Sequence, residues 1–443
     1  MDKVSKTSKI LEFFLLIEFA QMLFFPTSYT QFKLICLIPI FLICIGNLLK
    51  KPVLILTTGN KMLLSYMFLN LMFILYGVIR GNPGAVEFIP LELIYPLLYL
   101  LLGQFFPNRD GNLKQFVRVV FWIFFFIMIF DTVYLGAIVL NISGITDILS
   151  GLDFKMYTGR LGGLVNFSSG HTQSYVFCVP FLVILSLDLD EYIKKQMIPS
   201  KRIYYCCLVL ATLLSFLTSS RALILCVVVA YLFRIFVLLW KSKKIRENTI
   251  WGFMALVLVM IVVVVAKYNT IEGYVSGLWD DIKLGFSKVD FIDETSSEYL
   301  RATQKKILIS EWLNHPFIGN GTGAVASGII RNNEQPWSYE LSYYSMIFQK
   351  GIIGFIAFWT LVINTLVQII RNSLKKNVAL EIFPLIAGYI AFLIANSINP
   401  NLEKFSSIWV LYYPLLVLDY LERYTKDVEI TRTHLNGDRI ELD

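Results

Sequence analysis

The sequence predicts an all-α polytopic membrane protein with about twelve transmembrane helices and one long extracytoplasmic loop. Three observations lead to this class. The 443-residue chain is 56% hydrophobic and only 16% charged, whereas soluble proteins carry about 25% charged residues. Its apolar residues form runs of roughly 17–25, the length that crosses a bilayer core. The runs are continuous rather than alternating, which favours helices over barrel strands.

The expected spans follow one another along most of the chain. They are 10–25, 32–49, 62–79, 88–106, 117–140, 173–188, 203–219, 222–240, 250–267, 339–370, 379–397 and 405–421. Three lysines precede the first span as in a signal sequence, but no small-residue cleavage site follows, so we expect an uncleaved helix. The tenth span is long enough to be one tilted helix or two packed pieces, and Gly351 and Gly354 leave room for a bend.

Basic residues predict the orientation of the spans. Lysine and arginine cluster in one set of short loops and are sparse in the opposite set, so we expect both termini in the cytoplasm. The net charge of +7 therefore needs no nucleic-acid partner. Two loops on the outer side are long, 141–172 and 268–338. The second lies between the ninth and tenth spans and could form a small subdomain of an otherwise single membrane domain, 1–443.

Three arginines lie on the outer side of the predicted topology. Arg160 and Arg221 stand at the ends of apolar spans, and Arg301 lies on a helix expected over 296–312. A cation at a membrane face is costly unless it holds an anion, which indicates a site for a lipid-linked phosphate or pyrophosphate. Ser219 and Ser220 add hydroxyl donors beside Arg221. The alternatives are arginines that reach lipid headgroups, or a solvated helix face for Arg301.

Two residues on the same side are candidate bases. Glu340 starts the tenth span among aromatic residues, where desolvation would raise its pKa and nearby arginines would oppose that rise. His171 precedes the sixth span and could titrate near neutral pH, although capping of a helix explains it as well. Trp337, Tyr343 and Tyr344 could stack on sugar rings, or could belong to an interfacial aromatic belt.

Several ionisable residues lie within or near the spans and are functional candidates by default, although the sequence does not pair them. They are Glu18, Glu92, Asp131 and Lys350. The six cysteines lie in apolar runs with neither disulfide nor metal-ligand spacing. The outer loops contain no P-loop, no dinucleotide-binding motif and no acidic pair with metal-binding spacing, so we expect neither a cofactor nor a metal.

The chain resembles the bacterial O-antigen polymerase and O-antigen ligase superfamily, which includes capsular and exopolysaccharide repeat-unit polymerases. Three elements, which together cover about the second half of the chain, carry the resemblance. They are Arg160-Leu161-x-Gly163 with Asn166; Ser219-Ser220-Arg221; and the long-loop set of Arg301, Trp312, His315-Pro316-x-x-Gly319-x-Gly321, Glu340-Leu341-Ser342-Tyr343 and Gly351-Ile352-Ile353-Gly354. The N-terminal half is matched by hydropathy alone.

The resemblance implies a multispanning, metal-independent glycosyltransferase of the GT-C type, in which Arg160, Arg221 and Arg301 hold the pyrophosphate of an undecaprenyl-linked glycan. Ligases of the family usually carry a histidine just before the helix that follows the long loop. Glu340 occupies the comparable position here, which favours a polymerase.

We therefore expect a polymerase of lipid-linked oligosaccharide repeat units at the outer face of a bacterial plasma membrane. The lipid-linked oligosaccharide would be both donor and acceptor, and a chain-length regulator and a flippase would be partners. The alternatives are a ligase, which moves a finished glycan to another acceptor, and a lipid-oligosaccharide flippase or other transporter. A flippase should have charged residues along a central cavity and little extramembrane mass.

Overall fold

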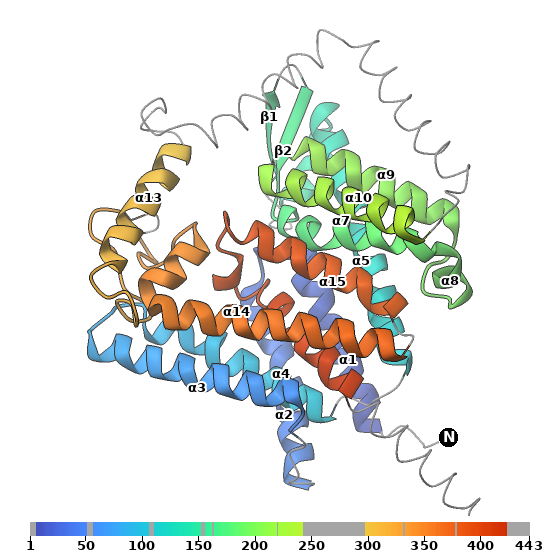
Figure 1. Cartoon of the computed structure of the whole chain (residues 1–443). Coiled ribbons are helices and arrows are strands. Elements are labelled where there is room, and N and C mark those ends of the chain that lie inside the picture. Colours follow the sequence, from blue (N-terminus) through green and yellow to red (C-terminus); the bar gives the residue numbers. More distant parts are fainter. Residues whose placement is uncertain are drawn as a thin grey trace, which may run out of the picture.

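The computed structural model describes residues 6–50, 56–105, 110–151, 156–161, 164–218, 220–241, 297–330, 333–376 and 379–422, and most of them are helical (Figure 1). The longer elements are α1 (Lys6–Phe24), α2 (Thr30–Lys50), α3 (Thr58–Ile79), α4 (Tyr95–Phe105), α5 (Asp110–Val139), α7 (Thr172–Leu185), α9 (Lys201–Leu217), α10 (Arg221–Lys241), α13 (Ser297–Trp312), α14 (Ser342–Lys376), α15 (Ala379–Ala395) and a helix over 409–422. The short helices are η1 (Val86–Phe88), η2 (Pro90–Ile94), α6 (Ser143–Gly151), η3 (Ser186–Asp188), α8 (Leu189–Lys194) and η5 (Asn401–Glu403).

Five of the described helical segments have the length and composition to cross a membrane. They are Thr30–Lys50, Thr58–Ile79, Val86–Gly103, Lys114–Val139 and Ser342–Leu374. Helical residues lie within every predicted span except 250–267, which is outside the described residues. The helical membrane class is thus supported, and the count of twelve spans stays a prediction.

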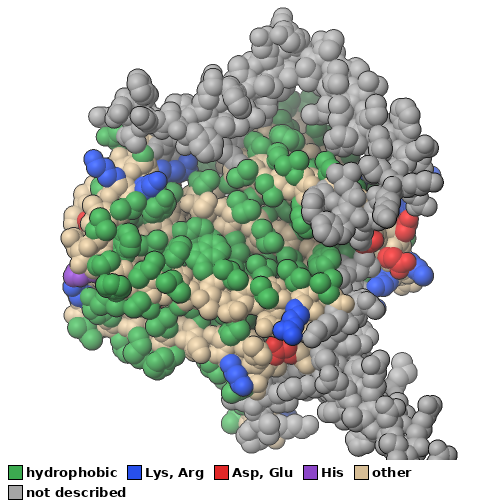
Figure 2. Space-filling view, viewed as in Figure 1, with side chains coloured by type: hydrophobic (Ala, Val, Ile, Leu, Met, Phe, Trp, Pro, Cys, Tyr) green, Lys and Arg blue, Asp and Glu red, His purple; other side chains and the backbone are tan. Residues whose placement is uncertain are grey.

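The surface of the bundle also fits a membrane environment. Figure 2 shows one face on which hydrophobic side chains fill the middle and most charged side chains lie toward the margins. Ile356, Ile363 and Val367 of α14 stay more than half exposed. Soluble proteins rarely expose apolar patches of this extent, whereas lipid covers them without cost.

The helix α7 is the centre of the core. Every residue from Ser174 to Leu185 is buried, and α7 packs against α15, α10, α9 and α5. Gly388 of α15 allows one of these approaches, because a Cβ there would lie 2.7 Å from the ring of Phe177. A helix that is apolar on all sides fits such a central position.

The helix α14 contains a break, as the glycines in the tenth span suggest. Gly351 has φ 62° and ψ −167°, a conformation that is essentially restricted to glycine. The loop between α13 and α14 forms hydrogen bonds with the backbone groups that the break leaves without helical partners. Asn320 N–H donates to Phe348 O at 2.9 Å, and Ile352 N–H donates to Pro316 O at 2.9 Å. The glycine-rich loop after α13 therefore serves as a clamp for the broken helix.

Residues 141–172 were expected to be a loop within an all-α protein, but they contain α6 and a short antiparallel hairpin. Strand β1 (Tyr157–Leu161) pairs with β2 (Leu164–Ser168), with Tyr157 opposite Ser168. Only Gly162 and Gly163 separate the strands in sequence, a pair that two-residue hairpin connections favour. The hairpin lies at the top of Figure 1, whereas α13 lies at the left.

Candidate functional site

The first site joins α13 to the start of α14. Arg301 Nε donates to Glu340 Oε2 at 2.8 Å, and both side chains are about a quarter exposed. One turn further along α13, Gln304 Oε1 accepts from the backbone N–H of Leu341 at 3.1 Å. The structure thus brings together two residues that the sequence proposed separately, one as a pyrophosphate ligand and the other as a base.

Two further charged residues belong to this site, Glu403 at the end of the turn η5 and Lys404 directly after it. Burial lowers the pKa of Lys404, and the negative charges of Glu403 and Glu340 oppose that shift. Two serine hydroxyls hold Glu403, because Ser338 Oγ donates to Oε2 at 3.0 Å and Ser345 Oγ donates to Oε1 at 3.2 Å. We call Arg301, Glu340, Glu403 and Lys404 the charged cluster.

Within the charged cluster, Glu403 has a pKa shifted toward neutral pH. Burial raises its pKa to about 7; Glu92 also raises it, and the two serine hydrogen bonds and Lys350 lower it. A partly exposed carboxyl with such a pKa can take up and release a proton near neutral pH. Such behaviour suits a general base, for which the ideal pKa lies near the working pH.

A buried ion pair lies close to the charged cluster, inside the bundle. Lys350 precedes the break in α14, and its Nζ contacts Glu92 Oε1 of η2 and Asn70 Oδ1 of α3, the latter at 2.9 Å. The other carboxylate oxygen of Glu92 is buried with no hydrogen-bond partner among the described residues. Lys350, Glu92 and Glu403 share a small cavity of about 50 Å³.

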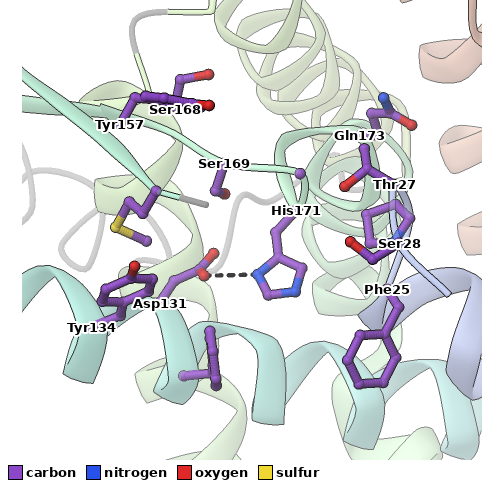
Figure 3. Close-up of a pocket in the computed structure, with 14 residues that line it drawn as sticks. Phe25, Thr27, Ser28, Asp131, Tyr134, Tyr157, Ser168, Ser169, His171 and Gln173 are labelled. Carbon is purple, nitrogen blue, oxygen red and sulfur yellow. Dashed lines mark hydrogen bonds and ion pairs between the residues drawn. The ribbon is translucent and has the colours of Figure 1, made fainter. Parts of the chain in front are cut away.

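The second site is a larger cavity beside the hairpin, of about 390 Å³ (Figure 3). We call it the hairpin cavity. Four segments line it, and many of the lining residues are aromatic or carry hydroxyl groups. They are 25–28 between α1 and α2; Phe130, Asp131 and Tyr134 of α5; Met156 and Tyr157; and 168–171 with Gln173 of α7.

His171 and Asp131 form the floor of the hairpin cavity. Figure 3 shows the imidazole facing the carboxylate, with Nδ1 and Oδ1 2.7 Å apart. Nε2 lies 2.7 Å from Phe24 O, and Tyr175 OH donates to Asp131 Oδ2 at 3.0 Å. Because both ring nitrogens are engaged and the side chain is 1% exposed, His171 links α5, α7 and the end of α1. This geometry suits a positioning residue better than a free base.

The predicted pyrophosphate ligands lie on elements that pack in different parts of the bundle. Arg160 lies in β1 opposite Val165, and Arg221 begins α10. The N–H of Ser220 donates to Thr218 Oγ1 at 3.4 Å, and Ser219 lies outside the described residues. The hairpin, which carries Arg160, packs beside α9, and α10, which carries Arg221, packs beside α7. Arg301 belongs to α13, which packs on α14.

The aromatic residues predicted to bind sugar make contacts within the protein. Tyr343 OH donates to Leu393 O at 2.7 Å, and its ring packs against Trp359. Trp337 covers Gly84, where a Cβ would lie 2.3 Å from the indole ring. Lys305 Nζ lies 5.4 Å from the centre of the Tyr344 ring. Sugar binding by these three side chains stays a prediction.

The sequence reasoning did not single out Glu403 or Gln173. An acidic residue in a short connection between two spans was the available indication for Glu403, because ionisable groups at membrane depth are functional candidates. Gln173 gave no such indication, since a glutamine near a helix start is common.

No protein-family model matches the chain, and no curated protein matches it. The function must therefore be argued from the two sites themselves.

Proposed function

We propose that the protein polymerises undecaprenyl-pyrophosphate-linked oligosaccharide repeat units in the synthesis of a surface polysaccharide, such as O-antigen, capsule or exopolysaccharide. One observation carries the proposal, the contact of Arg301 with Glu340 beside Glu403 and Lys404. This charged cluster supplies cations for a pyrophosphate and carboxyl groups for proton transfer at one end of a helical bundle. The active site would face the outside of the plasma membrane.

The reaction is a glycosyl transfer. The acceptor hydroxyl oxygen attacks the anomeric carbon of the donor, and the bond from that carbon to the pyrophosphate oxygen breaks. Undecaprenyl pyrophosphate leaves with the electron pair, and Arg301 and Lys404 stabilise its charge, an effect worth several kcal/mol. The hydroxyl proton passes to a carboxylate. Glu403 suits this role better than Glu340, because its pKa of about 7 lies near the working pH, whereas Glu340 forms an ion pair with Arg301.

The test is the conversion of a single lipid-linked repeat unit by the purified protein. We expect a ladder of multiples on a gel, and we expect the Glu403→Gln variant to lose it. The Glu87→Gln variant is the matched control, because Glu87 is exposed on η1. Substrate that stays unchanged with wild-type protein confirmed to be folded would contradict the proposal. Transfer of a whole glycan to a second acceptor would identify a ligase instead.

One observation favours a transporter as the second candidate. Lys350 and Glu92 form a buried ion pair between helices near a cavity, and such pairs mark substrate or ion pathways in transporters. Sealed vesicles distinguish the two functions. A transporter would move the lipid-linked oligosaccharide between leaflets without lengthening it, whereas a polymerase would lengthen it in detergent, where no leaflets exist.

A further inference from the structure

The hairpin cavity has the size of a ligand site. Its volume of about 390 Å³ lies within the roughly 300–1,000 Å³ that small-molecule sites occupy. Its walls come from α5, α7, the hairpin and the loop between α1 and α2, so the tertiary fold assembles it from distant parts of the chain. The charged cluster does not include any of these residues.

The cavity contains polar atoms that lack partners within the described part of the chain. Ser169 Oγ and Gln173 Oε1 are buried, and neither has a hydrogen-bond partner within the described residues. Figure 3 places Ser169 above the Asp131–His171 pair. Leaving such atoms without a partner costs about 1–3 kcal/mol each. A serine hydroxyl can donate and accept, and an amide oxygen accepts. A hydroxyl group, as on a sugar, can donate to either oxygen and can also accept from the serine.

The described lining of the cavity suits a neutral ligand better than a phosphate. No lysine or arginine occurs among the described residues that line it. Its acidic side chain, Asp131, is paired with His171 at 2.7 Å, so the two together offer no free positive charge. A phosphate buried there would be an uncompensated anion, which is strongly unfavourable. A neutral ligand meets no such penalty.

The aromatic rings complete the site. Phe25, Phe130 and Tyr134 line the cavity beside the hydroxyl-bearing residues. Phe130 packs edge-on against His171 with ring centres 5.6 Å apart, which fixes its orientation. Apolar surface mixed with a few placed polar groups is typical of sites for small polar molecules. It matches a sugar ring, which has apolar C–H faces and hydroxyl groups at its edge.

A buried lysine connects this cavity to the charged cluster. Lys33 is fully buried, and its Nζ contacts Phe25 O in the cavity wall and Ser406 Oγ at 2.6 Å. Ser406 follows Lys404 by two residues. The same side chain thus holds the cavity wall and the segment that carries Glu403 and Lys404. A substrate with a neutral glycan and a charged pyrophosphate would find a surface for each part.

We propose that the hairpin cavity binds neutral sugar residues of the glycan, through Ser169 and Gln173, while the charged cluster faces the pyrophosphate. This proposal rests on the proposed polymerase function for the identity of the glycan. The cavity itself argues for a neutral, hydroxyl-rich ligand whatever reaction follows.

The test is equilibrium binding of the free repeat-unit oligosaccharide, from which lipid and pyrophosphate have been removed. Thermal stabilisation of the purified full chain reports binding. We expect saturable stabilisation of the wild type and about tenfold weaker binding by Gln173→Leu, because one buried hydrogen bond is lost. Ser169→Ala is the second variant, in case Gln173→Leu does not fold. Gln115→Leu is the matched control, because Gln115 lies near the start of α5, whereas the cavity is lined by residues near the other end of that helix.

Each outcome separates this proposal from the polymerase. Equal oligosaccharide binding by the wild type and both cavity variants, or no binding by protein that still makes a ladder, would overturn the sugar site and leave the polymerase standing. Inorganic pyrophosphate that binds the wild type but not Gln173→Leu would also overturn it. Oligosaccharide binding that the cavity variants weaken, in a protein that makes no ladder, would support the cavity and reject the polymerase.

Discussion

Arg301 and Glu340 lie 39 residues apart in the chain, and the 2.8 Å hydrogen bond between Nε and Oε2 joins α13 to the start of α14. Each residue sits where two helices meet, and each is partly shielded from water. The pair therefore has two consequences. It docks α13, and it keeps a guanidinium beside the carboxyl groups of the charged cluster.

The docking role predicts coupling between the two side chains. Arg301→Ala and Glu340→Gln should each lower the free energy of unfolding, and the double variant should lose less than the sum. We expect a coupling energy of about 1 kcal/mol, because the pair is neither fully exposed nor fully buried. Denaturant unfolding of the four proteins in one detergent measures it. Additive losses would show that the pair does not dock α13.

Substitution of the two arginines in the outer sequence motifs should prevent polymer formation. Arg160→Ala and Arg221→Ala should abolish the ladder while the protein remains inserted in the membrane. Lysine at either position should rescue poorly, because an ammonium cannot form the bidentate contact of a guanidinium with phosphate. Arg202→Ala is the control, since Arg202 is exposed at the start of α9. Normal chain lengths in both alanine variants would remove the pyrophosphate role of these residues.

Glu403 predicts a dependence of stability on pH. Its pKa rises from 4.5 to about 7 on folding, so the folded protein holds this proton more tightly than the unfolded chain does. The stabilising contribution is complete below about pH 4.5 and is lost as pH rises through about 7. The unfolding temperature, measured between these two pH values, should therefore fall less with rising pH in Glu403→Gln than in the wild type. Parallel curves of unfolding temperature against pH for the two proteins would contradict the raised pKa.

The same group predicts a dependence of activity on pH. If Glu403 accepts the acceptor proton, the rate of ladder formation should rise through about pH 7 as the carboxyl ionises. Glu403→Asp should retain part of the rate, and Glu403→Gln should lose it. An unchanged profile in Glu403→Gln would assign the proton transfer to another residue.

The break in α14 predicts a strict requirement for glycine. A Cβ on Gly351 would lie 2.3 Å from Phe317 O, and φ is 62°. Gly351→Ala should therefore cost more than about 2 kcal/mol of stability, through backbone strain and the clash. Gly136→Ala is the control, because Gly136 lies in α5 with open space around it. A helix that straightened without loss of stability in Gly351→Ala would show that the clamp is dispensable.

The sequence by itself indicated the helical membrane class, because apolar runs of bilayer length are a local property that needs no tertiary information. It also located α13 within one residue, and it named Gly351 and Gly354 as places for a bend, of which Gly351 is the break. Periodicity and glycine act locally. Glu340 emerged as a candidate at the start of an apolar span, and Arg301 as a cation in the long outer loop.

Only the tertiary structure decided which charges meet. The contacts of Arg301 with Glu340, His171 with Asp131 and Lys350 with Glu92 join residues from 39 to 258 positions apart, and no spacing rule relates such positions. Burial raises the pKa of Glu403, and hydrogen bonds from two serines on another segment oppose that rise. The sequence around Glu403 reveals neither effect. The hairpin cavity has the same origin, because its walls become neighbours only when the helices pack. The sequence thus determines the elements and their environment, whereas packing decides which side chains form a site.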